Sequence, residues 1–156
     1  MPVKDFLPRS CLFCLFDLLH QQGYEVIGPQ VIDSAILYRP LQDPDRLPAG
    51  IEQIQKPGQY RLIRTDSPRL FSWANGPQAL KPLTFTPRET LWRSELQADG
   101  SLRFHEVIKT PGPTAVIGVR GCDLAALALQ DRHFHDDPYY RQRRDALLLI
   151  AVDCSH

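Results

Sequence analysis

The chain has 156 residues, with 18 basic and 18 acidic side chains and a formal net charge of +0. This length suits one domain, and a hydrophobic share of 43% can form a core, which argues against intrinsic disorder. Balanced charge argues against a broad nucleic-acid interface, which needs a basic excess. No run approaches the ~18 apolar residues of a membrane helix, and the first residues lack a signal-peptide pattern. We therefore expect a single cytoplasmic domain over residues 1–156.

The first expected element is a helix over residues 8–22. Pro8 suits its first turn, where the missing N–H of proline needs no partner, and Gly23 suits the position just after its end. The helix is apolar around most of its circumference, so we expect it to be deeply packed or to face something outside this chain. It contains Cys11 and Cys14, which have the spacing of a redox or metal-binding pair. Because both fall on the apolar face, we interpret them as core residues.

The middle of the chain is expected to contain short strands joined by loops. The predicted strands are residues 24–28, 35–38, 60–64 and 102–108. Asp99-Gly100 is a hairpin signal, and a helix is predicted over residues 87–92 because proline suits a helix start. Two large apolar residues in a stretch rich in turn formers, Phe71 and Trp73, are expected to close over a core or a site.

The C-terminal third carries the clearest pattern. Residues 114–119 and 146–152 are compact apolar runs, typical of strands buried on both faces. Residues 123–135 between them have helical spacing, and residues 138–144 suggest a short polar helix. Strands joined by a helical crossover are parallel. The expected fold class is therefore mixed α/β: an N-terminal helix and β-hairpins, followed by a β-α-β unit with buried parallel strands.

Cys122 and Cys154 each lie just beyond one of these two strands. Ligands bind at the carboxyl ends of parallel strands, so we expect both thiols at the same edge of the sheet. Two thiolates are fewer than the four ligands of an iron–sulfur cluster. Either they belong to a cluster site completed by other ligands, or they are buried thiols at strand ends. A third interpretation makes Cys122 a nucleophile beside Arg120 and Asp123, although the sequence places no histidine as its base.

Several stretches of the chain occur together in one known family. They are residues 23–29, 56–62, 82–92, 118–127, 137–144 and 152–154. They resemble the N-terminal region of the iron–sulfur subunits of sulfhydrogenases (the β subunit) and of anaerobic sulfite reductase. The resemblance covers roughly residues 5–156, and its more specific parts are Arg-x-Cys-Asp-Leu from Arg120 and Pro-Arg-Glu from Pro87. Gly121 stands where the family usually has proline.

The resemblance implies a non-catalytic electron-transfer subunit. In the family, further cysteines and a dicluster ferredoxin module follow this region; the ferredoxin module is absent from this chain. Cys122 and Cys154 would then bind a 4Fe-4S cluster, with its other ligands beyond His156 in the full-length protein. The implied partners are a flavin- or NAD(P)H-binding protein and a catalytic redox subunit such as hydrogenase or sulfite reductase, with no nucleic acid and no membrane span. The alternative is a cofactor-free domain that docks subunits through its N-terminal helix and residues 139–144.

Overall fold

The computed structural model describes residues 7–74, 80–107 and 110–153, which form a mixed α/β fold as expected. Its helices are the 3₁₀ turns η1 (Arg9–Cys11) and η2 (Pro44–Arg46) and the α-helices α1 (Leu12–Gln21), α2 (Lys81–Thr84), α3 (Gly121–His133) and α4 (Pro138–Asp145). Its strands are β1 (Glu25–Ile32), β2 (Ala35–Pro40), β3 (Ile51–Lys56), β4 (Gln59–Arg64), β5 (Trp92–Leu96), β6 (Leu102–Glu106), β7 (Thr114–Val119) and β8 (Leu147–Ala151). Within the described residues, no helix is long and apolar enough to cross a membrane.

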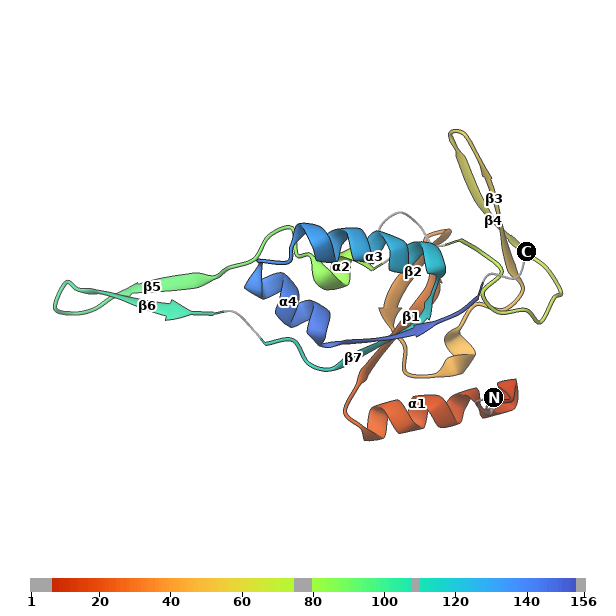
Figure 1. The fold of residues 1–156 in the computed structure, drawn as a ribbon, viewed down its shortest axis with the longest axis horizontal. Helices are drawn as coiled ribbons and strands as arrows, with labels where there is room; N and C mark the ends of the chain where they lie inside the picture. Colours follow the sequence, from red (N-terminus) through yellow and green to blue (C-terminus); the bar gives the residue numbers. More distant parts are fainter. Residues whose placement is uncertain (1–6, 75–79, 108–109, 154–156) are drawn as a thin grey trace.

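A four-stranded sheet with the order β2-β1-β7-β8 forms the centre of the fold. β1 is antiparallel to β2, whereas β7 is parallel to both of its neighbours. Helix α1 lies on one face of this sheet, and α2, α3 and α4 lie on the other (Figure 1). The predicted β-α-β unit is therefore confirmed as β7, α3 and β8, with α4 inserted before the last strand.

Strand β7 contributes to the hydrophobic core on both faces of the sheet. Ala115 and Ile117 pack in the cluster formed with α1, and Val116 and Val119 pack in the cluster formed with Leu127 of α3. All four β7 side chains are at most 2% exposed. A continuous apolar run is what a strand covered on both faces requires, so the prediction for residues 114–119 is confirmed.

Gly118 forms a bulge that determines which way the end of β7 faces. The pairing with β8 shifts between Ile117 and Val119, and Gly118 has φ +83°, a conformation that favours glycine. One extra residue reverses the alternation of side chains, so Val119 faces the same core as Val116. The Gly118 carbonyl accepts a hydrogen bond of 2.8 Å from the buried Tyr38 hydroxyl, which fixes the bulge from the β2 side.

Strand β8 differs from the expectation of a strand buried on both faces. It lies at the edge of the central sheet, and Leu148 on it is 39% exposed. The reason is the position of α1, which packs over β1 and β7 through Val26, Ala115 and Ile117. An apolar run of this length cannot distinguish a central strand from an edge strand, because the neighbours decide burial.

The predicted helix over residues 87–92 is wrong. Residues 87–91 have no regular structure, and Trp92 begins β5, where it pairs with Glu106 of β6. The few residues between Pro87 and this strand are too short for a stable helix. Glu89 instead forms an ion pair of 2.9 Å with Arg143 of α4, which holds the segment extended across the domain.

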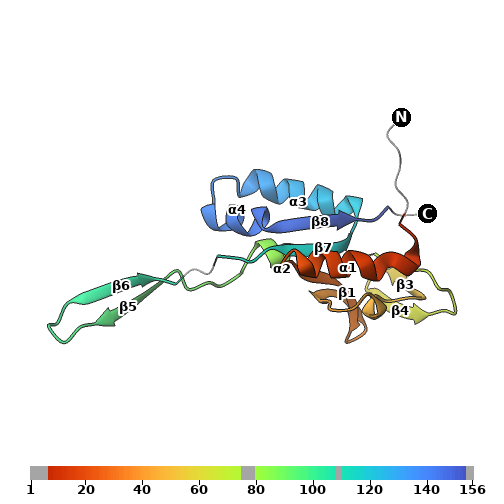
Figure 2. The same ribbon diagram turned by 90° about the horizontal axis from the view of Figure 1, so that it is seen from below.

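Two hairpins extend from the central sheet (Figure 2). Strands β3 and β4 form the first, and its base is closed by Trp73, which is 2% exposed and packs with Ile36 and Ile51. The expectation that Trp73 closes over a core is confirmed. Strands β5 and β6, joined at the predicted Asp99-Gly100 turn, form the second, which we call the β5–β6 arm (residues 92–106). Every strand residue of this arm is exposed.

Helix α1 is only partly packed. Phe16 and Leu19 are buried against the sheet, whereas Phe13 and Leu18 are 54% and 49% exposed. The prediction allowed either deep packing or an outward apolar face, and the described residues show one buried and one outward face.

Replacing Gly118 with alanine should destabilise the fold far more than the same change at Gly58. Both glycines have positive φ, but a Cβ at Gly118 would lie 2.7 Å from Cε1 of Phe71, whereas nothing lies within 4 Å at Gly58. We expect Gly58→Ala to cost about 1 kcal/mol from backbone strain and Gly118→Ala about 3 kcal/mol, because overpacking adds to the strain. Urea unfolding of both variants measures this, and equal losses would show that the bulge is not tightly packed against Phe71.

Candidate functional site

The carboxyl ends of β7 and β8 meet at the edge where the sequence places its candidate cysteines. Val119 pairs with Ala151, and the N–H of Val152 donates a hydrogen bond of 2.8 Å to the Val119 carbonyl. Helix α3 begins at Gly121, and the thiol of Cys122 in its first turn is free and exposed. Cys154 lies outside the described residues. The described backbone brings the segment leading toward it beside the segment leading to Cys122, and the meeting of the two thiols stays a prediction.

Arg120 and Asp123 hold the start of α3 in place. The Asp123 carboxylate accepts a hydrogen bond of 3.0 Å from the backbone N–H of Arg120, which caps the helix. The Arg120 guanidinium is 4% exposed and donates to the carbonyl of Phe71 at 2.7 Å, tying the helix to the loop over the core. These contacts serve to position Cys122, and neither is a contact that the nucleophile interpretation requires.

The prediction that Cys11 and Cys14 are core residues is wrong. Cys11 is half-buried and Cys14 is exposed, and both thiols are free. Because the helix is apolar around most of its circumference, periodicity does not reveal which side faces the sheet; Phe16 and Leu19 take that side. In the part of the chain that the structure describes, no group of three or more His, Cys, Asp or Glu side chains could hold a metal ion.

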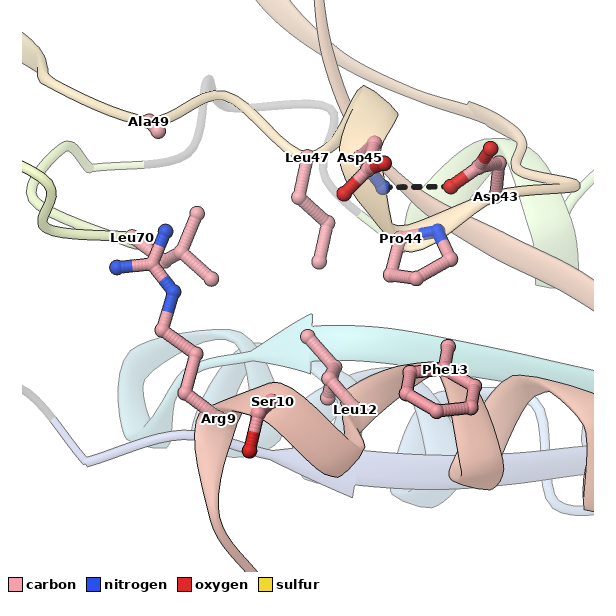
Figure 3. A pocket seen from close by; sticks show the side chains of 10 residues that line it. All are labelled: Arg9, Ser10, Leu12, Phe13, Asp43, Pro44, Asp45, Leu47, Ala49 and Leu70. Atoms are coloured by element: carbon pink, nitrogen blue, oxygen red, sulfur yellow. Dashed lines mark hydrogen bonds between the residues drawn. The ribbon is translucent and has the colours of Figure 1, made fainter.

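A pocket of about 440 Å³ opens between the start of α1 and the turn η2 (Figure 3). Its apolar lining includes Leu12 and Leu47, and charges of both signs stand on its walls. Arg9, on the α1 side, donates a hydrogen bond to the Pro68 carbonyl. Asp43, on the η2 side, caps η2 by accepting from the N–H of Asp45 at 2.8 Å. No motif in the sequence indicates this pocket, because segments distant in the chain form its walls.

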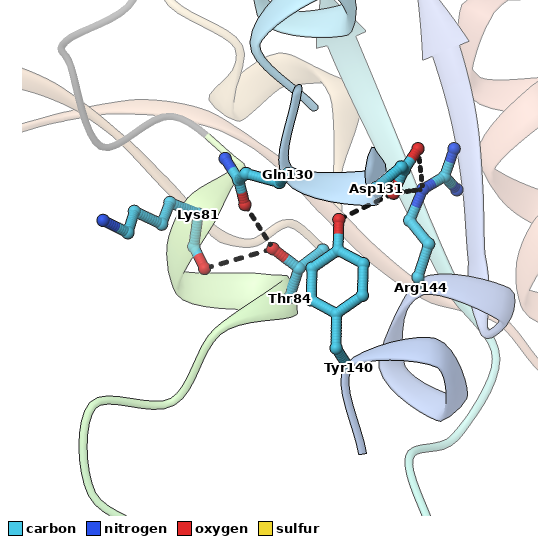
Figure 4. A network of polar contacts seen from close by, with 6 residues as sticks. All are labelled: Lys81, Thr84, Gln130, Asp131, Tyr140 and Arg144. Carbon is cyan, nitrogen blue, oxygen red and sulfur yellow. Dashed lines mark hydrogen bonds and ion pairs between the residues drawn. The ribbon is translucent and has the colours of Figure 1, made fainter. Parts of the chain in front are cut away.

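A polar network ties α2, α3 and α4 together (Figure 4). The Tyr140 hydroxyl donates to Asp131 at 2.6 Å, and Arg144 donates to the same carboxylate at 3.1 Å. Thr84 of α2 donates to Gln130 of α3 at 3.1 Å. Burial, and then the hydrogen bond to Asp131, raise the pKa of Tyr140 well above its ordinary value.

This network uses part of the predicted docking patch at residues 139–144. Tyr140 is 2% exposed, and Arg144 is paired with Asp131. Arg143 is paired with Glu89 and also donates to the Thr84 carbonyl at 2.9 Å. Much of the basic cluster therefore stabilises the domain itself.

An exposed apolar surface on the β5–β6 arm was missed in the sequence. Its large side chains, which we call the arm face, are Trp92, Leu96, Leu102 and Phe104. The signal was present as strict alternation of apolar with polar or charged residues in both strands, the pattern of a strand with one apolar face. The helix predicted up to Trp92 concealed that pattern.

Comparisons with known proteins identify no family for this chain. No family model matches it, and no curated protein and no solved structure matches it. The resemblance to iron–sulfur subunits therefore stays a prediction from the motifs.

Replacing Tyr140 with phenylalanine should lower stability at neutral pH and remove a dependence on alkaline pH. The hydrogen bond to a carboxylate contributes about 1.5–3 kcal/mol, which the variant lacks at pH 7. An unfolded tyrosine ionises near pH 10, whereas folded Tyr140 has a raised pKa. Its stabilising effect is therefore complete below about pH 10 and declines above it. Unfolding free energies measured at pH 7 and above pH 10 should converge; a constant difference would contradict this.

Proposed function

We propose that this chain is the N-terminal domain of an electron-transfer subunit, with Cys122 at a 4Fe-4S cluster site on the carboxyl edge of β7 and β8. The observation that carries the proposal is the β7–β8 register, which places an exposed Cys122 next to the exit of β8. The domain would position and tune the cluster, since cofactors of this kind carry the redox chemistry themselves. It would relay electrons between a flavin- or NAD(P)H-binding partner and a catalytic redox subunit in the cytoplasm.

The chemistry of the edge supports this proposal. Iron–sulfur clusters are held by cysteine thiolates, normally four in number. Within the described residues, this edge supplies the Cys122 thiol, and its position is fixed by the Arg120 and Asp123 contacts. Cys154 is the second ligand proposed here, and the resemblance places the others after His156. Rigid placement of a ligand by neighbouring hydrogen bonds is typical of metal sites.

Replacing Cys122 with serine in the full-length protein should remove or alter one cluster. After anaerobic reconstitution, we expect a loss of up to about four iron and four sulfide per chain, or a changed electron paramagnetic resonance spectrum of the reduced protein. Cys14→Ser is the matched control, because Cys14 is also a free and exposed thiol but lies on α1. Unchanged iron, sulfide and spectrum in Cys122→Ser, or equal losses in both variants, would remove Cys122 from the cluster.

A second candidate function is that of a cofactor-free docking domain for other subunits. The observation that favours it is the outward face of α1, where Phe13 and Leu18 are about half exposed. Large apolar side chains of this kind are common anchors of protein interfaces. Phe16 does not belong to this surface, because it is 1% exposed and packs against the sheet.

Replacing Phe13 and Leu18 together with glutamine should weaken the complex with the native partner subunits. Loss of two anchors should raise the dissociation constant at least ~10-fold while the fold persists, because both side chains lie outside the core. Gln21→Ala, a polar change on the same helix, is the control. Titration of the purified partner subunits measures the affinity, and an unchanged constant would exclude this face from docking.

A further inference from the structure

The two faces of the β5–β6 arm differ in chemistry. Cross-strand pairing places the arm face on one side, with Ser94 at its centre opposite Phe104. The four large side chains of the arm face are between 56% and 74% exposed. Glu106 lies at the base of the same side, opposite Trp92. This is an apolar layer of the kind that normally packs against another layer.

The opposite side of the arm is charged and suited to water. It carries Arg93, Glu95, Arg103 and His105, with Glu95 directly opposite Arg103. The His105 Nε2 atom lies 3.7 Å from a Glu95 carboxylate oxygen. A lone two-stranded hairpin is at best marginally stable in water, and a second layer packed about 10 Å away stabilises it. Such a layer fits the arm face and not the charged side.

We propose that the arm face is a dimerisation surface, covered by the arm face of a second copy of this chain. The argument is self-complementarity. A two-fold axis along the arm brings Phe104 of each copy over Ser94 of its partner, so the largest central side chain meets the smallest. The same axis brings Leu96 over Leu102 at the tip. Because each arm has one apolar side, the contact is isologous and closes at two copies.

The area of the arm face suits a modest but specific dimer. Given that a large apolar or aromatic side chain offers ~150–250 Å², four of them at their observed exposures present about 400–500 Å² per copy. Two copies would remove about 800–1,000 Å² from water through these side chains alone. The backbone, Ser94 and Glu106 add to this sum. The total reaches the ~1,000 Å² that a specific interface requires.

The charges of the arm favour this occupant over a membrane or a nucleic acid. Arg93 and Arg103 are outnumbered by Glu95, Asp99 and Glu106, so the arm has no basic excess to attract phosphates. Asp99 stands at the tip, and hydrogen bonds from Ser101 lower its pKa, so its carboxylate stays ionised. A charged tip opposes insertion into a bilayer.

Sedimentation equilibrium of the full chain from about 1 to 200 μM tests the proposal. We expect a reversible dimer, and Phe104→Gln should raise its dissociation constant by at least ~10-fold. Arg103→Gln is the matched control, because the same substitution one residue away falls on the charged side and should leave the constant unchanged. Both variants should keep the melting temperature of the domain core, since neither side chain is buried.

A second variant separates this packing from general stickiness. Ser94→Trp fills the space that Phe104 of the partner would occupy, so it should weaken the dimer, whereas an adhesive apolar surface would bind more tightly. A monomer throughout the concentration range, or tighter association of Ser94→Trp, would overturn the proposal. Co-sedimentation with phosphatidylcholine–phosphatidylglycerol vesicles that Phe104→Gln abolishes would reassign the arm face to lipid. Cys122→Ser should leave the dimer intact, so this test is independent of the cluster.

Discussion

The fold depends on strand β7 being covered on both faces. Its side chains join the core under α1 to the core under α3, and the Gly118 bulge makes Val119 face the second of these cores. Tyr38 from β2 holds the bulge, and Phe71 packs against it so closely that a Cβ there would clash. The loop, two layers of helices and the sheet therefore converge on one glycine.

That same bulge lies three residues before the start of α3, and so it also positions the candidate site. Arg120 reaches back to the carbonyl of Phe71, the residue that covers the bulge, and Asp123 caps the helix. Cys122 is thus an exposed thiol on a rigid support. Rigid support with an accessible reactive group is what a ligand to a cofactor needs, and it is unlike an ordinary buried strand-end thiol.

The periphery of the domain contrasts with this packed centre. The outer face of α1, the β8 edge and the arm face all present large apolar side chains, among them Phe13, Leu148 and Phe104. Apolar surfaces rimmed by charge commonly mark contacts with other chains. Their separation over three elements suits a domain that makes several contacts at once, with the arm face serving a second copy and α1 free for a different subunit.

The sequence by itself determined the β-α-β unit, the hairpin at Asp99-Gly100 and the end of α1 at Gly23, because apolar runs, turn dipeptides and glycine act locally. It also placed Cys122 just beyond a buried strand. Only the tertiary structure decided that β8 is an edge strand, that Cys14 is exposed and that residues 87–91 are not helical. These outcomes depend on which element packs against which, and an apolar side chain has the same pattern in sequence whether a neighbour covers it or not.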